Sequence, residues 1–266
     1  MELPKKIVQL ISGESYQTDE IGMSDSAVLL FKDKVLKVQV CGEEAGNEYE
    51  LYKWLKGKLP VPQILAYEVE GNRAFLLMSK CHGKMSCDEA YMRDPRRQIR
   101  LLAKALKQLW RVDIQNCPCD NRLEQKLRQA RFRVEHDLVD IDNVEPDTFG
   151  EGGFRDPADL LQWLFAHRPK EEPVLSHGDF CLPNIFLDGD EVAGYIDLGR
   201  GGIADKWCDI ALCYRSLSHN YSGKYQKGIS VGQSYPDYDD LLLFKELGIE
   251  PDWEKIRYYI LLDELF

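Results

Sequence analysis

"SHGDFCLPNIFLDGDEVAGYIDLGR", residues 176–200, places two carboxylates and an amide around a short, mainly apolar segment. After Asn184 the chain reads IFL, then a turn at 188–190, then VAGYID, which predicts a β-hairpin. Because a hairpin brings its flanking residues side by side, we expect Asn184 and Asp197 to lie close together. Asp179 lies on the loop just before. The segment could be a polar turn between core elements, but this grouping favours chemistry.

These three side chains suit phosphoryl transfer. Carboxylate and amide oxygens are ligands that Mg²⁺ prefers, so Asn184 and Asp197 are predicted metal ligands. Asp179 is free of the metal and is predicted to be the catalytic residue that orients or deprotonates a hydroxyl. The H-x-D-x-x-x-x-N spacing from His177 to Asn184 is that of the protein-kinase catalytic loop, with Gly178 in place of its arginine.

The first eighty residues predict a small antiparallel sheet carrying one helix. Apolar runs separated by tight turns indicate two hairpins, and the apolar spacing between these hairpins is that of a helix. The expected strands are 27–31, 34–40, 63–70 and 73–78, and the expected helix is 43–59.

Lys37 stands out within this sheet. Strand alternation places Val35 and Lys37 on one face and Leu36 and Val38 on the other. A lysine on the inward face of a half-buried strand needs an anion, and we expect Glu48 of the following helix to be one and nucleotide phosphates to be the second. The alternative is a lysine whose stem lies along the sheet edge with its ammonium in water.

After residue 82 the pattern becomes mainly helical. Apolar residues recur at helical spacing in four stretches, and Asp-Pro at 156–157 is typical of a helix start. The expected helices lie within 96–113, 121–140, 157–168 and 252–266. The connection 143–154 is rich in Gly, Pro and acidic residues and is long enough to suggest a function.

Composition narrows the classes of protein. The 266 residues carry a formal net charge of −11, which disfavours nucleic acid as a partner and leaves room for a cationic ligand. The longest apolar runs are five residues, far short of the roughly 20 of a membrane span. No secretory signal is evident, so we expect a cytoplasmic location. The eight cysteines follow no zinc or disulfide spacing and are expected to be reduced.

Three segments carry a resemblance to a known family. HGDFCLPN (177–184), IDLGRGGIADKWCDIA (196–211) and PDWEKIRYYILLDELF (251–266) resemble the aminoglycoside 3'-phosphotransferases, and the similarity extends from about Gly22 to the last residue. The resemblance implies an enzyme that uses Mg²⁺ and ATP to phosphorylate the 3'-hydroxyl of cationic antibiotics such as kanamycin and neomycin, conferring resistance. It leaves GTP open as the donor.

The implied fold is α+β and bilobal, like that of protein kinases. We expect residues 1–81 to form a nucleotide-binding lobe with an antiparallel sheet, one helix and the hinge. Residues 82–266 would form a larger, mainly helical lobe with the catalytic loop and the substrate site. A monomer or a weak dimer is expected.

The resemblance also implies a role for each matched position. Asp179 is expected to face the sugar hydroxyl, and Asn184 and Asp197 to hold two Mg²⁺ ions. The expected nucleotide contacts are Lys37, Glu48, the backbone around Met23 and Ser24, the backbone of Ser79 and Cys81, and the side chains of Phe186 and Ile196.

The last residues give a clue to the substrate. Asp263, Glu264 and the carboxylate of Phe266 place three negative charges at the end of a predicted helix, where they oppose the helix dipole. A cation could offset that charge; the alternative is a frayed acidic tail. The resemblance implies a wall for the ammonium groups of an aminoglycoside, which Arg215 would fix by pairing with a carboxylate.

Two departures from the family pattern affect these expectations. The loop 143–154 looks longer than in the relatives, and Glu145 and Asp147 are our candidates for substrate contacts within it. Val35 stands where the family often carries an aromatic ring that stacks on adenine. The choice between ATP and GTP therefore stays open.

Four residues close to the motifs are not among the predicted site residues. His177 is expected to support the catalytic loop by packing and hydrogen bonding, not to act as a base. Trp207 and Asp209 are expected to tie the following helix to that loop. For Arg200, a phosphate-facing role and a structural role are equally compatible with the sequence.

Three alternative functions can be compared with the sequence. A kinase of another small alcohol, such as choline, homoserine or a fructosamine, would share the residues from 179 to 197. A binding protein without chemistry is disfavoured because the lysine, the metal ligands and the catalytic carboxylate are all present. A protein kinase is disfavoured because no A-P-E segment follows Asp197.

Overall fold

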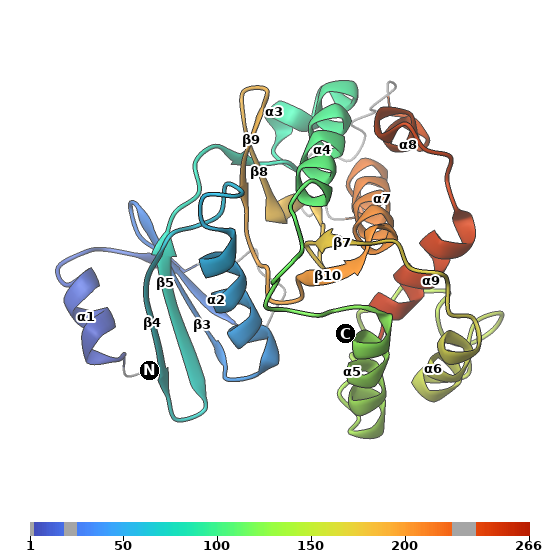
Figure 1. The fold of residues 1–266 in the computed structure, drawn as a ribbon, viewed down its shortest axis with the longest axis horizontal. Coiled ribbons are helices and arrows are strands. Elements are labelled where there is room, and N and C mark those ends of the chain that lie inside the picture. The colour runs from blue at the N-terminus through green and yellow to red at the C-terminus, as the bar shows by residue number, and fades with distance from the viewer. Residues whose placement is uncertain (1–2, 19–25, 225–237) are drawn as a thin grey trace.

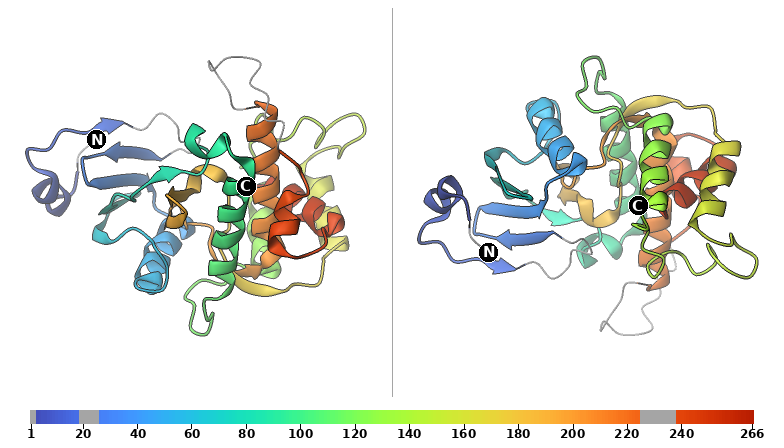
Figure 2. Two further views of the ribbon diagram at one scale, coloured as in Figure 1. Left: turned by 90° about the horizontal axis from the view of Figure 1, so that it is seen from above. Right: turned by 90° about the horizontal axis from the view of Figure 1, so that it is seen from below.

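The computed structural model describes residues 3–18, 26–224 and 238–266. An antiparallel sheet with two helices lies at one end of the long axis, and a mainly helical part lies at the other (Figures 1 and 2). The predicted phosphate-loop residues Met23 and Ser24 fall outside the described residues. The expected α+β fold with an N-terminal sheet is confirmed.

The N-terminal sheet is antiparallel throughout. Both expected hairpins are present, with strand ends within one or two residues of the predicted positions. Across the sheet the strands are β1 (Gln17–Thr18), β2 (Ala27–Leu30), β3 (Lys34–Val40), β5 (Arg73–Ser79) and β4 (Ile64–Glu70).

The two faces of this sheet bury different apolar clusters. Leu36 and Val38 are buried with Ile7 of α1 (Lys5–Ile11), on the face away from the helical part. Lys37 points to the opposite face, toward α2 (Glu43–Leu55), so the predicted alternation is correct. The sequence predicted this helix as far as 59, but Gly57 adopts φ +79° and reverses the chain after Leu55.

The C-terminal part is built mainly from helices, and the four expected helical stretches are confirmed. Pro157 follows an Asp156 cap, as predicted from the sequence. The sequence analysis did not predict α1, α3 or α8, which are short, and it gave no bounds for the long helix α7 that carries Trp207 and Asp209. The described helices are α3 (Glu89–Met92), α4 (Pro95–Trp110), α5 (Leu123–Glu135), α6 (Pro157–Ala166), α7 (Lys206–Ser222), α8 (Leu242–Leu247) and α9 (Trp253–Asp263).

Two small sheets position the catalytic segment. The predicted hairpin is formed by β8 (Ile185–Asp188) and β9 (Glu191–Tyr195), with β6 (Lys84–Met85) beside it. The second sheet pairs β7 (Pro173–Ser176) with β10 (Gly202–Asp205). The catalytic loop therefore begins at the end of β7 and runs through a short 3₁₀ turn (Leu182–Asn184) into β8.

The end of the chain returns to the middle of the molecule. In all three ribbon views the C-terminus lies between the sheet and the outer helices, close to α5 in Figure 1. Within the described ranges, no helix combines the length and the apolar character needed to cross a membrane.

Candidate active site

The amide of Asn184 is locked onto Asp179. Its Nδ2 donates to the Asp179 carbonyl oxygen at 3.0 Å and to Asp179 Oδ2 at 2.9 Å. Because the amide nitrogen is engaged in this way, the amide oxygen is the atom that can coordinate a cation. Cys181 Sγ lies 3.1 Å from Asp179 Oδ1, and burial, with the nearby Asp179 charge, raises the pKa of this thiol well above its ordinary value. The thiol therefore stays protonated and donates to the carboxylate.

A buried carboxylate of α7 holds the catalytic loop. Asp209 accepts hydrogen bonds from Ser176 Oγ at 2.9 Å, from the backbone N–H of His177 at 2.8 Å and from that of Gly178 at 2.9 Å. This confirms the expected tie between the helix and the loop. Trp207, for which the same tie was predicted, donates through its indole to Glu172 at 3.1 Å, which lies before β7 and not in the loop.

Gly178 explains the departure from the protein-kinase motif. Its φ is +81°, and a Cβ at this position would lie 1.8 Å from the backbone carbonyl oxygen of Arg200. No side chain fits there, because the segment after β9 crosses directly over the loop. The arginine of the kinase motif is therefore excluded by backbone packing.

His177 is a packing residue. It is fully buried, and its ring contacts those of Phe180 and Tyr195. Its Nδ1 lies 3.4 Å from the backbone nitrogen of Asp179, whereas Nε2 has no hydrogen-bond partner among the described residues. These contacts agree with a supporting role.

Lys37 joins the sheet to the catalytic segment. Its Nζ lies 2.9 Å from Glu48 Oε2 and 2.7 Å from Asp197 Oδ1, and its side chain is 10% exposed. Burial lowers the pKa of Lys37, but Glu48 and Asp197 outweigh it, so that the pKa is raised overall. The predicted Glu48 partner is correct, and the second anion in the structure is Asp197.

Asp197 is held in an uncommon conformation. Its φ is +62°, its backbone N–H donates to Tyr52 Oη at 3.0 Å, and its side chain is 44% exposed. Burial raises the pKa of this carboxyl, but the attraction of Lys37 is stronger and the net direction is downward. The side chain is thus charged and accessible, which fits the role of a cation ligand. Non-glycine residues in this backbone region occur preferentially at functional sites.

The protein offers few ligands of its own for a metal. In the part of the chain that the structure describes, no three His, Cys, Asp or Glu side chains form a metal-binding group. Asn184 and Asp197 provide two oxygen donors, and the backbone of Ile196 donates to the Asn184 carbonyl at 3.0 Å, which holds both ends of the hairpin together. This donor set fits Mg²⁺, which is usually bound through one or two protein oxygens together with phosphates and waters.

The connection after β5 packs against the β8–β9 hairpin. A Cβ added at Gly194 would lie 2.7 Å from Cys81 Sγ and 3.4 Å from the Cβ of Phe186. The backbone N–H of Ser79 donates to the Gln63 carbonyl oxygen at 2.8 Å, and Ser79 Oγ accepts from the backbone N–H of Gln63 at 2.9 Å. Cys81 and Phe186, which lie far apart in the sequence, thus line one region. The sequence analysis missed Gly194, although a glycine inside a strand signals close approach of another segment.

The acidic residues near the end of the chain are paired with arginines. Asp263 binds Arg200 Nη1 at 3.1 Å and also contacts Arg215, and Glu264 Oε1 lies 3.1 Å from Arg215 Nη1. The side chains of Asp263 and Glu264 are only 17% and 4% exposed. The alternative of a frayed tail is wrong, and the pairing predicted for Arg215 is confirmed.

Arg200, three residues after Asp197, connects this cluster to the segment that carries the predicted metal ligand. Its guanidinium reaches Asp263 and lies 3.7 Å from Glu44 of α2. Burial lowers the pKa of Arg200, but Asp263, Asp179 and Glu44 together raise it. Of the two roles left open by the sequence, the structure shows ion pairing within the protein.

Phe266 lies among cationic side chains. The guanidinium of Arg200 is 5.0 Å from its ring centroid, and Arg133 donates to its backbone oxygen at 2.7 Å. Besides the predicted Arg215, two further arginines of the chain therefore lie against the acidic end of the last helix.

Only one of the two loop candidates joins this cluster. The backbone N–H of Glu145 donates to Glu264 Oε2 at 2.8 Å, and its carboxylate contacts His219 at 3.0 Å and Lys224 at 2.8 Å. Asp147 is exposed, and no hydrogen bond or ion pair of its side chain to these groups is present in the described parts of the chain.

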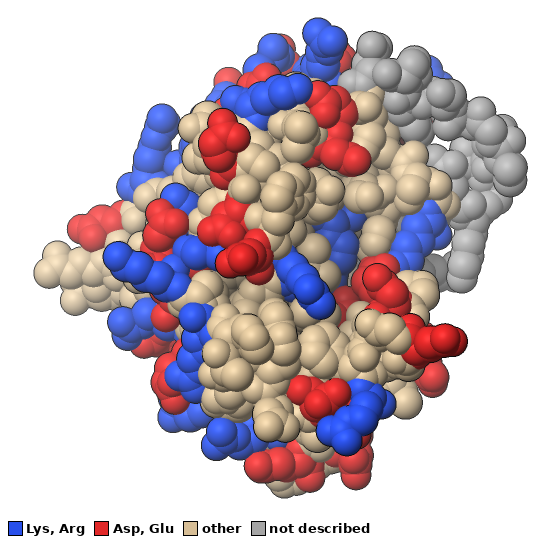
Figure 3. Space-filling model, turned by 90° about the vertical axis from the view of Figure 1, so that its right-hand side faces the viewer, with Lys and Arg blue, Asp and Glu red and all other residues tan. Residues whose placement is uncertain are grey.

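Charge is not segregated on the surface of the helical part. Acidic and basic side chains are interspersed on the face shown in Figure 3. Since the net charge is not gathered into one acidic area on this face, local pairs decide where a cation can bind.

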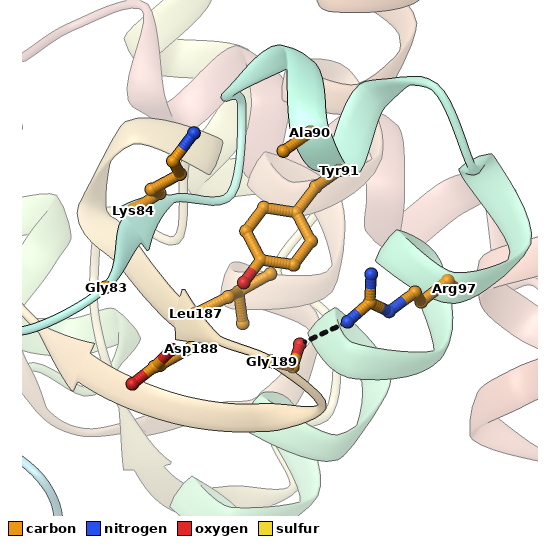
Figure 4. Close-up of a pocket in the computed structure, with 8 residues that line it drawn as sticks. All are labelled: Gly83, Lys84, Ala90, Tyr91, Arg97, Leu187, Asp188 and Gly189. Atoms are coloured by element: carbon orange, nitrogen blue, oxygen red, sulfur yellow. Dashed lines mark hydrogen bonds between the residues drawn. The ribbon is translucent and has the colours of Figure 1, made fainter.

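A separate pocket of about 440 Å³ lies beside the β8–β9 turn. Its wall includes Tyr91 and Arg97, and Arg97 donates to the carbonyl oxygen of Gly189 at 2.7 Å (Figure 4). Arg97 is also paired with Asp190 at 2.8 Å, and Lys84 at the other side is paired with Asp88 at 3.0 Å. None of the predicted site residues lines this pocket, and its cations are already partnered.

Comparison with known proteins agrees with this geometry. Residues 17–244, more than half of the chain, match the model of a phosphotransferase enzyme family. An aminoglycoside 3'-phosphotransferase of Enterococcus faecalis is 42% identical over 224 residues, covering 83% of this chain and 78% of the relative. One of Niallia circulans is 35% identical over 273 residues, covering 99% and 97%.

The fold is also similar to solved structures. A crystal structure of a type VIII aminoglycoside 3'-phosphotransferase superposes with a TM-score of 0.77 at 28% sequence identity, covering 96% of this chain and 94% of that one. The similarity therefore includes both the sheet and the helical part.

Proposed function

The chain belongs to the aminoglycoside 3'-phosphotransferases, and from this premise we propose that it transfers the γ-phosphate of ATP to the 3'-hydroxyl of aminoglycosides such as kanamycin and neomycin. One observation carries the proposal most directly. Lys37 of the sheet reaches Asp197 beside the catalytic loop at 2.7 Å, so phosphate-binding and metal-binding groups converge on one point.

Asn184 and Asp197 would hold Mg²⁺ at this point. When bound, the metal supplies charge neutralisation for the phosphate oxygens of the nucleotide. Lys37, held by Glu48, would contact the α and β phosphates once a nucleotide arrives. The supporting observation is that the Asn184 nitrogen is fixed on Asp179, which leaves the amide oxygen for coordination.

Asp179 would accept a hydrogen bond from the reacting hydroxyl and orient it toward the phosphate. The bonds from Asn184 and Cys181 fix the rotation of its carboxylate, and fixed geometry is the main source of catalysis in phosphoryl transfer. We assign no covalent step to the protein.

The base would lie between the connection after β5 and the β8–β9 hairpin. The Ser79 N–H is engaged with Gln63, so its carbonyl would accept from the adenine amine, and the Cys81 N–H would donate to the ring. Phe186 and Ile196 would line the pocket. We also propose that Met23 and Ser24 close over the phosphates and that the lobes divide at residues 81 and 82.

The substrate would bind near the acidic residues at the end of the chain. We propose contacts with its ammonium groups from carboxylates of the loop, of the last helix and of the final residue, and a fixing role for the arginine. These residues are Glu145, Asp147, Arg215, Asp263, Glu264 and Phe266. Since ATP is the proposed donor, we propose a cytoplasmic location. We also propose that the protein is a monomer or a weak dimer.

An ADP-release assay tests this function. Purified protein is incubated with Mg²⁺ and either ATP or GTP, together with kanamycin, neomycin, an analogue lacking the 3'-hydroxyl, choline or homoserine. We expect release with the two antibiotics and ATP, no release with the 3'-deoxy analogue, and a phosphate at the 3' position by NMR. Release with choline or homoserine alone would assign the enzyme to another class of small-alcohol kinase.

A further inference from the structure

The ammonium group of Lys224 contacts the carboxylate of Glu145, a residue that we propose contacts the substrate. Its Nζ lies 2.8 Å from both carboxylate oxygens of Glu145. Gly223 ends α7 with φ +82°, and the backbone N–H of Lys224 donates to the His219 carbonyl at 3.0 Å. The helix end therefore fixes the backbone of Lys224 beside the loop that carries Glu145.

The carboxylates of this region differ in how firmly their partners are held. Asp263 and Glu264 are paired with arginines whose side chains are only 17–21% exposed, from Arg200 and Arg215. Lys224 is 39% exposed and rests on a flexible stem. Among these pairs, Lys224 is the partner that a competing cation can displace with least disturbance of the core.

The chemistry of the two cations is the same. A lysine side chain and a protonated aminoglycoside amine both present a compact ammonium with three donors. We propose that Lys224 occupies an ammonium subsite at Glu145 and competes with the substrate for it, so that Lys224 is a residue determining substrate affinity and specificity. This inference rests on the proposed function.

A structural role and a competing role for Lys224 predict opposite effects of its removal on substrate binding. If the lysine only braced the loop 143–154, its removal would loosen Glu145 and weaken substrate binding. If it competes, its removal strengthens binding. Glu145 keeps two other anchors in either case, the bond of its N–H to Glu264 at 2.8 Å and the contact with His219 at 3.0 Å.

Steady-state kinetics of Lys224→Met separates the two roles. Methionine keeps an unbranched stem and removes the charge. We expect the KM for kanamycin or neomycin to fall about 2- to 5-fold, the range of a partly exposed ion pair, with kcat and the KM for ATP unchanged. Lys224→Arg keeps the cation and is expected to behave like the unaltered enzyme.

Lys104→Met is the matched control. Lys104 is also 39% exposed and paired with a carboxylate, Glu191 at 2.6 Å, but it belongs to α4 and the β8–β9 turn. Its substitution should leave the KM for aminoglycosides unchanged. In a Glu145→Gln background, Lys224→Met should also have no effect, because the contested carboxylate is gone.

The outcomes that contradict the two proposals are distinct. If the unaltered enzyme phosphorylates no aminoglycoside, both the proposed function and this inference are overturned. If it does, an unchanged or increased KM in Lys224→Met overturns the inference alone. Calorimetric titration of kanamycin into Lys224→Gln measures the binding step directly: tighter binding supports competition, and equal or weaker binding contradicts it.

Discussion

The two ends of the candidate site use the same kinds of residue with different charge balance. At the nucleotide end, Lys37 is shared between Glu48 and Asp197, so carboxylates outnumber cations. At the substrate end, Glu145, Asp263 and Glu264 each have a cation of the chain beside them, and the cluster is close to neutral. In the proposed function, a divalent cation would therefore be attracted to the first end, whereas a cationic substrate would have to exchange with existing partners at the second.

This difference also concerns burial. Glu48 is 1% exposed and Lys37 10%, whereas Glu145 is 24% and its partner Lys224 39% exposed. Buried pairs are strongly destabilised when one member is lost, and exposed pairs contribute little. The Lys37–Glu48 pair is thus part of the folded framework, whereas the Glu145–Lys224 pair of the substrate end can adjust.

The largest expected effect lies between the two ends. Asp179→Ala should lower kcat by about 10²–10⁴-fold while ATP binding stays nearly intact, because the residue orients the hydroxyl and does not hold the nucleotide. Single-turnover kinetics together with ATP titration measures both quantities. Asp190→Ala, at a surface carboxylate 68% exposed, is the control and should keep full activity. Normal turnover in Asp179→Ala would contradict the assignment.

The next effect tests the framework character of the nucleotide end. Lys37→Met leaves Glu48 and Asp197 without their shared cation and should lower the free energy of unfolding by about 3–5 kcal/mol. Urea denaturation measures the loss. Lys34→Met, on the same strand but paired with Glu14 near the surface, should lower the free energy of unfolding far less, because water already solvates that pair. Equal losses in the two variants would contradict the framework role of the buried Lys37 pairs.

The smallest effect concerns acid stability at the substrate end. Burial raises the pKa of Asp263, but Arg200 and Arg215 bring it below its ordinary value of 3.8. A carboxyl with a depressed pKa contributes stability that is fully present above about pH 4 and is lost as the pH falls through the folded-state value. Urea denaturation at pH 6 and pH 3 should therefore show a smaller acid loss in Asp263→Asn than in the unaltered protein. An equal loss of stability in both proteins would show that the pairing of Asp263 with the arginines does not contribute to the acid dependence.

Local patterns predicted the parts of the site that depend on neighbours in sequence. The turn at 188–190 follows from its turn-forming residues, and the orientation of Lys37 follows from the two-residue alternation of a strand. Both predictions are confirmed. The pairing of Lys37 with Glu48 also follows, because a strand and the next helix have few ways to pack.

These local patterns could not predict contacts between segments that are far apart in the sequence. The crossing of Arg200 over Gly178 and the ion pair of Arg200 with Asp263 join residues that no spacing relates. The resemblance pointed to Arg215 as a partner of the acidic residues at the end of α9, but no pattern in the sequence indicated that Arg200 and Arg133 would also lie there. β7 and β10 are four residues each, too short for a periodic signal.

The crossing at Gly178 has a consequence for control of the enzyme. In protein kinases, activation commonly proceeds through a phosphorylated segment that is ordered by arginine side chains. Here the place of the kinase-motif arginine is filled by main chain, 1.8 Å from where a Cβ would be. That position therefore offers no arginine side chain that could bind a regulatory phosphate, which separates this loop from the loops of protein kinases that are controlled in that way.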